Sequence, residues 1–150
     1  MLKRVVFLSI VGSVMLLGLS GCPGVACFGI DTCQLQGTWQ STSGSLTYTI
    51  EIQDDTIKYT HKYTVLGISV SSGFSGTFDI DATQRPKHMD ISTTRIFTGG
   101  VGVDLDTPEK VLAIYDVSRK TLSICMGTSD LRPDSLESDD TITLTRLDSN

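Results

Sequence analysis

Residues 46–65 read LTYTIEIQDDTIKYTHKYTV, with apolar and polar side chains alternating on both sides of Asp54 and Asp55. Alternation with a period of two is typical of a strand with one buried face. Two such runs around a two-residue turn predict a β-hairpin. We expect the buried side of its second strand to be formed by Ile57, Tyr59, His61, Tyr63 and Val65.

The same alternation continues on both sides of this hairpin, and no helical period is found from residue 35 onward. Glycine-rich residues 98–103 are expected to form a mobile loop, and acidic residues 131–140 a second loop. About eight short amphipathic strands favour one antiparallel meander barrel, because closure removes exposed edges, with a β-sandwich as the alternative. The further strands are expected at residues 37–42, 74–81, 89–91, 111–117, 121–126 and 141–147.

The first residues have the layout of an export signal. MLKR is followed by an apolar run at residues 5–19, which is shorter than the ~20 residues needed to span a bilayer. LSGC at 19–22 then resembles the bacterial lipobox, in which a cysteine thiol accepts a diacylglycerol before cleavage. We therefore expect a signal peptide at residues 1–21 and lipid attachment at Cys22, with further acylation, for example by palmitate, making the anchoring stable.

The rest of the chain is expected to be one domain. Residues 22–34 contain glycines, a proline and two cysteines without periodicity, which predicts a lipid-anchored tether, and residues 35–150 then form the barrel domain. The formal net charge is −5, and loss of Lys3 and Arg4 with the signal makes the mature chain more acidic. Without a Lys/Arg cluster, nucleic acid and anionic headgroups are poor partners, so membrane attachment should come from the lipid.

Three cysteines remain once Cys22 is lipidated, and export permits disulfides. Cys27–Cys33 is the local pairing, and Cys33–Cys125 is the alternative. Alternation places Cys125 on the same face as Ser123, pointing outward. The cysteine spacing does not suit a structural zinc site, and we expect no metal and no cofactor.

Several motifs occur in the order found in a family of lipocalin-like small domains from planctomycete bacteria, and the chain resembles that family over nearly all of residues 34–148. The resemblance implies a β-barrel in a cell-envelope setting and implies no reaction. The motifs are LQGTW (35–39), GTFDID (76–81), RPKHMDI (85–91), IYDV (114–117), TLSIC (121–125), RP (132–133) and ITLTR (142–146).

Gly37-Thr38-Trp39 is also similar to the lipocalin signature of the first strand, in which a tryptophan plugs the closed end of the barrel. The resemblance implies an arginine across that ring, with Arg146 as the first candidate and Arg132 as the second. A cation–π contact of this kind is worth on the order of 0.5–2 kcal/mol.

Residues that carry catalysis are not recognisable. Only His61 and His88 could serve as histidine bases, and no G-x-S-x-G motif occurs. His88 is expected at the surface. Tyr59, His61 and Tyr63 share the apolar face, where they are either ligand contacts in the barrel interior or satisfied core residues.

Three functions remain open. The first is a lipid-anchored barrel that binds a small apolar ligand, with Gly76 leaving space inside. The second is a structural or protein-interaction lipoprotein with a packed barrel, and the third, disfavoured, is an envelope hydrolase. Pro23 after the anchor lacks an acidic inner-membrane retention signal, which favours the outer membrane. The volume of the barrel interior separates the first two functions.

Overall fold

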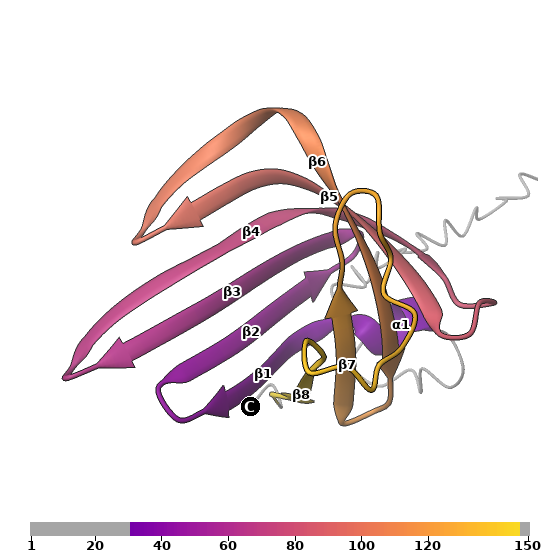
Figure 1. Ribbon diagram of the computed structural model, residues 1–150, viewed down its shortest axis with the longest axis horizontal. Helices are drawn as coiled ribbons and strands as arrows, with labels where there is room; N and C mark the ends of the chain where they lie inside the picture. The colour runs from indigo at the N-terminus through magenta and orange to yellow at the C-terminus, as the bar shows by residue number, and fades with distance from the viewer. Residues whose placement is uncertain (1–30, 148–150) are drawn as a thin grey trace, which may run out of the picture.

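The computed structural model describes residues 31–147 of the chain. Within this range, one short helix is followed by eight strands (Figure 1). Their bounds are α1 (Asp31–Leu35), β1 (Gly37–Ser43), β2 (Leu46–Gln53), β3 (Thr56–Val65), β4 (Ile68–Asp81), β5 (Lys87–Thr98), β6 (Val101–Val117), β7 (Thr121–Met126) and β8 (Ile142–Arg146).

The eight strands form one antiparallel sheet in which each strand pairs with the next and β8 returns to β1. The ring closes through two residue pairs, Trp39 with Arg146 and Gln40 with Thr145. This confirms the predicted meander barrel, and the β-sandwich alternative is wrong. The predicted hairpin at 46–65 is also confirmed, with Gln53 opposite Thr56 across the Asp54-Asp55 turn.

One half of the barrel has a packed core. Inward side chains of all eight strands meet there, and Leu35 of α1 joins them. Each fully buried Leu or Ile side chain contributes roughly 1.5–3 kcal/mol relative to exposure. The core residues are Leu35, Trp39, Ile50, Ile52, Ile57, Phe78, Met89, Ile91, Ala113, Tyr115, Val117, Leu122, Ile124 and Leu144.

The other half of the barrel is open. β7 pairs with β6 only between Ala113 and Val117, so residues 101–110 of β6 have no β7 neighbour. The hairpins β1–β2, β3–β4 and β5–β6 extend past the closed half, and their tips point the same way, away from α1 (Figure 1). We call the sheet formed by residues 41–48, 59–74 and 96–103 the open half.

Two sequence expectations are wrong in the open half. Tyr63 and Val65 share a face with buried Ile57 as expected, but Tyr63 is 55% exposed and Val65 is also exposed, because no strand stands opposite them. The predicted loop at 98–103 is a hairpin turn at Gly99-Gly100, and residues 101–103 belong to β6. Both glycines have positive φ, as a two-residue hairpin loop requires.

The start of the domain also differs from expectation. The sequence predicts an irregular tether up to Gln34, whereas residues 31–35 form α1 and Leu35 is buried in the core. Trp39 Nε1 donates a 2.8 Å hydrogen bond to the carbonyl oxygen of Leu35, which fastens the helix to the barrel. No helix within residues 31–147 is long and apolar enough to cross a membrane.

Candidate functional site

Four ring side chains meet where the packed core ends and the open half begins. The ring centroid of Tyr59 lies 5.3 Å from Phe74, 5.9 Å from His61 and 6.4 Å from Tyr48. We call Tyr48, Tyr59, His61 and Phe74 the aromatic cluster. Register explains the arrangement, because Tyr48 pairs with His61 across β2–β3 and Tyr59 pairs with Phe74 across β3–β4.

A pocket of about 430 Å³ opens beside this cluster, on the inner face. Tyr48 and Tyr59 form one wall, and the segment 139–143, which leads into β8, forms the opposite wall. Leu46 and two serines of β1, Ser41 and Ser43, complete the lining. The pocket is open to solvent, so a ligand could enter without movement of the barrel.

Tyr59, at the centre of the aromatic cluster, is uncharged. Burial raises the pKa of Tyr59 to about 12, with the nearby Tyr48 as a smaller cause, so its phenol is neutral at physiological pH. His61 has only the ring contact with Tyr59 and forms no hydrogen bond to another described residue. The carboxylates of Asp139 and Asp140 belong to the segment on the far side of the pocket.

Beyond the cluster, the inner face of the open half carries several apolar side chains, with Ser72 and Thr98 between those of β3–β4 and those of β5–β6. Pairing places Tyr63 opposite Val70, Val65 opposite Ile68, and Ile96 opposite Val103. All six side chains are exposed. We call this set, together with Val101, the apolar inner face.

Only some of the ligand contacts predicted from the sequence lie together at the pocket. Tyr59 lines the pocket, His61 lies beside Tyr59, and Tyr63 lies further out on the apolar inner face. Tyr48 and Phe74 were missed as site residues. Counting outward from the Asp54-Asp55 turn pairs Tyr48 with His61, so the hairpin register could have identified Tyr48.

Gly76 does not leave space for a ligand, which corrects the expectation. A Cβ at Gly76 would lie 2.0 Å from the carbonyl oxygen of Ser92, so the backbone of β5 already fills that position. The close approach occurs where the β4–β5 register shifts. On the paired residue Thr93, the buried Oγ1 has no hydrogen-bond partner among the described residues.

At the closed end, Arg146 lies across the ring of Trp39, with its Cζ 4.0 Å from the ring centroid. Its guanidinium also donates to the carbonyl oxygens of Gln34 and Gln36, and to that of Arg119 at 2.9 Å. Arg146 therefore joins the end of α1, the first strand and the β6–β7 turn. This arrangement is structural and lies away from the pocket.

Arg132, the second candidate for the plug, serves a different purpose. It forms an ion pair with Asp90 and donates to the carbonyl oxygen of Met89, thereby fastening the loop after β7 to β5. The hydrogen bond from Arg132 is the main reason why the pKa of Asp90 is lowered, and Lys110 adds to it.

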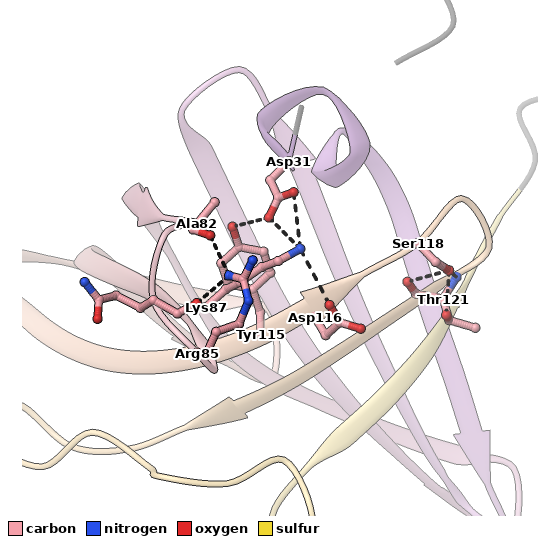
Figure 2. A network of polar contacts seen from close by, with 9 residues as sticks. Asp31, Ala82, Arg85, Lys87, Tyr115, Asp116, Ser118 and Thr121 are labelled. Atoms are coloured by element: carbon pink, nitrogen blue, oxygen red, sulfur yellow. Dashed lines mark hydrogen bonds and ion pairs between the residues drawn. The ribbon is translucent and has the colours of Figure 1, made fainter. Parts of the chain in front are cut away.

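A second polar network fixes α1 on the barrel (Figure 2). The carboxylate of Asp31 accepts a 2.8 Å hydrogen bond from the Tyr115 hydroxyl and lies 3.0 Å from Lys87 Nζ. Lys87 also approaches Asp116 at 3.6 Å. Burial, and then the Asp31 carboxylate, raise the pKa of Tyr115, so the phenol remains a hydrogen-bond donor. These groups hold the helix on the barrel.

The cysteines divide into two kinds. Cys33 is disulfide-bonded, whereas Cys125 is a free, buried thiol, which excludes the Cys33–Cys125 alternative. Cys22 and Cys27 lie outside the described residues, so the Cys27–Cys33 pairing and the lipid site stay predictions. Cys125 lies within 3.3 Å of Ser138 Oγ, under the loop after β7.

Other hollows of the described residues are weaker candidates for a binding site. Two hollows of about 750 and about 510 Å³ lie over the outer face of β1–β4, where threonine, serine, glutamine and lysine side chains alternate with the core. Such a face is ordinary for a solvated sheet. No group of three histidine, cysteine or acidic side chains within residues 31–147 could hold a metal ion.

Comparison with protein families, curated proteins and solved structures finds no match to this chain. The resemblance to the lipocalin-like small domains therefore stays a prediction.

Proposed function

We propose that this protein is a lipid-anchored lipoprotein of the bacterial cell envelope, and that its barrel binds a neutral amphiphile with a single acyl chain. The ligand would lie in the pocket beside the aromatic cluster and extend along the apolar inner face. The proposal treats the packed half as the scaffold and the open half as the binding part.

One observation carries this proposal. The pocket and the apolar inner face gather exposed apolar side chains on one side of the sheet, and Asp139 and Asp140 are charged groups in the pocket wall. Exposed apolar side chains gathered on one face mark binding sites, whereas scattered ones need no explanation. The tyrosine hydroxyls and the His61 imidazole supply a few polar groups among apolar ones, as ligand sites do.

The charges around the pocket indicate the ligand class. Asp139 and Asp140 belong to the pocket wall, where they would repel a free fatty acid carboxylate. Tyr59 is neutral and supplies no positive charge that would offset this repulsion. An uncharged head group, such as the glycerol of a monoacylglycerol, fits better because hydroxyls can bond to serine, tyrosine and carboxylate groups without an unpaired charge.

The test uses residues 22–150 with Cys22→Ser, which removes the signal and the anchor and keeps the barrel. Calorimetric titration with a monoacylglycerol below its micelle concentration should show binding, and a fatty acid of equal chain length should bind at least ten-fold more weakly. Leu46→Asp places a charge in the pocket and should abolish binding. Thr47→Asp, its outward neighbour on β2, is the matched control and should bind normally.

His61→Leu separates binding from a packed structural barrel. Because His61 has no hydrogen-bond partner within residues 31–147, the substitution should leave the melting temperature almost unchanged and alter ligand affinity. A much lower melting temperature, together with no binding of any amphiphile, would favour the structural lipoprotein instead.

The predicted lipid attachment at Cys22 has a separate test. Cys22→Ser in the full chain, expressed in a bacterium supplied with labelled fatty acid, should lose the label. Label retained by the variant would refute lipidation at Cys22. Peptide mapping under non-reducing conditions would identify the partner of Cys33, which we expect to be Cys27.

A further inference from the structure

The tips of two hairpins carry apolar side chains that nothing covers. At the β3–β4 turn, Leu66 is 97% exposed and Ile68 is 73% exposed. At the β5–β6 turn, Val101 and Val103 are also exposed. Both turns lie at the end of the molecule opposite α1 (Figure 1). We call Val65, Leu66, Ile68, Val101 and Val103 the tip surface.

Leu66 is unfavourable at its position in the free protein. It occupies the first place of the two-residue β3–β4 turn with a φ of 50°, followed by Gly67 with a φ of 80°. A turn with two positive φ values favours asparagine, aspartate or glycine, and a leucine there is strained as well as solvated. A medium that removes Leu66 from water would offset both penalties.

Acidic residues are absent from the segments that contain the three hairpin tips, although the whole chain has 17 acidic residues. The segments are residues 38–50, 56–78 and 91–103. Their cations are Lys58, Lys62 and Arg95. Lys58 pairs with Glu51 at 3.4 Å and Arg95 with Asp104 at 2.9 Å, whereas Lys62, four residues before Leu66, has no ion pair within residues 31–147.

We propose that the tip surface docks on an anionic lipid bilayer, with Leu66 and its neighbours entering the interfacial region and Lys62 meeting lipid phosphates. Tyr63 is exposed and lies between Lys62 and the apolar residues of the β3–β4 tip. Tyrosine takes such a position, between apolar and charged groups, at membrane interfaces. This contact is separate from the predicted lipid anchor, since α1 and the tips lie at opposite ends of the barrel. It departs from the expectation that an acidic domain without a Lys/Arg cluster is a poor partner for anionic headgroups.

Vesicle sedimentation tests the proposal with residues 22–150 carrying Cys22→Ser, so that no acyl anchor contributes. Vesicles of phosphatidylglycerol and phosphatidylethanolamine at low salt should bind the protein, and vesicles of phosphatidylcholine should bind it more weakly. Lys62→Gln should lower the partition coefficient about five-fold on the anionic vesicles only, since a lysine near such a surface contributes about 1 kcal/mol.

Leu66→Asn is the decisive variant, because it should weaken membrane binding while maintaining or raising the stability of the fold. We expect at least a ten-fold lower partition coefficient together with a melting temperature equal to or above that of the parent. Leu131→Ser is the matched control, since Leu131 is 70% exposed in the loop after β7, away from the tips, and should bind vesicles normally.

Three results would overturn the proposal. The first is that the protein does not bind anionic vesicles. The second is that Leu66→Asn and Leu131→Ser lose vesicle binding equally. The third is that Leu66→Asn binds the vesicles as well as the parent does. The first would assign the tips to a protein partner. None of these results affects the amphiphile-binding test, which depends on Leu46 and His61.

Discussion

Arg146→Lys is expected to destabilise the barrel by about 2–3 kcal/mol while keeping its charge. The guanidinium donates to three backbone carbonyl groups, those of Gln34, Gln36 and Arg119. A lysine ammonium can reach about one of them, so two charge-assisted hydrogen bonds of roughly 1 kcal/mol each are lost at this partly exposed site. Loss of the flat stack on Trp39 adds roughly 0.5 kcal/mol.

The chain contains one tryptophan, so its emission reports directly on the end of the barrel that changes. Urea titration followed by Trp39 fluorescence should show a lower midpoint with an unchanged slope. In a thermal melt, the loss corresponds to roughly 6–15 °C for a domain of this size.

Arg85→Lys is the matched control. Arg85 also donates to two carbonyl oxygens, those of Ala82 and Gln84, but both belong to its own turn, so we expect a change below about 0.5 kcal/mol. If Arg146→Lys is as stable as the parent, or if both variants lose equally, Arg146 does not join α1 to the barrel as described.

Three further substitutions test the interior and the polar networks. Thr93→Val should raise stability by about 1 kcal/mol in a thermal melt, because the buried hydroxyl lacks a partner; a loss would reveal a hydrogen bond there. For Asp90, the folded-state pKa lies below the unfolded value of about 3.9 because Arg132 stabilises the carboxylate, so its contribution is present at neutral pH and lost as the solution is acidified below about pH 4. Urea midpoints of Asp90→Asn and the parent should therefore converge in acid, and a constant difference would contradict this. Tyr115→Phe should lower stability by about 1 kcal/mol, measured by urea titration, through loss of the hydrogen bond to Asp31; an unchanged midpoint would contradict the contact.

The sequence alone determined the local elements wherever alternation and turn residues agreed. In residues 46–65 the side chains alternate on either side of Asp54-Asp55, so the hairpin, its register and the shared face of Ile57, Tyr59 and His61 followed from the chain itself. A barrel followed because about eight such strands in succession need an edge-free arrangement.

Alternation assigns a side chain to a face but does not say whether anything stands opposite that face. Ile57 and Tyr63 lie on the same side of β3, yet one is in the core and the other in solvent, because β7 and β8 are short and cover only one half of β6 and β1. The predicted ligand residues were therefore assigned to the correct face, although the pocket, its aspartates and the exposed tips depended on strand lengths that only the assembled sheet sets.

The remaining differences have the same origin in long-range contacts. Helix α1 is too short for a period to be read, and Asp31 is held by Lys87 and Tyr115, which are distant in sequence. The resemblance to lipocalins suggested Arg146 first and Arg132 second as the partner of Trp39, without contacts to decide between them. The choice between them is made by the β1–β8 pairing, which places Arg146 directly opposite Trp39.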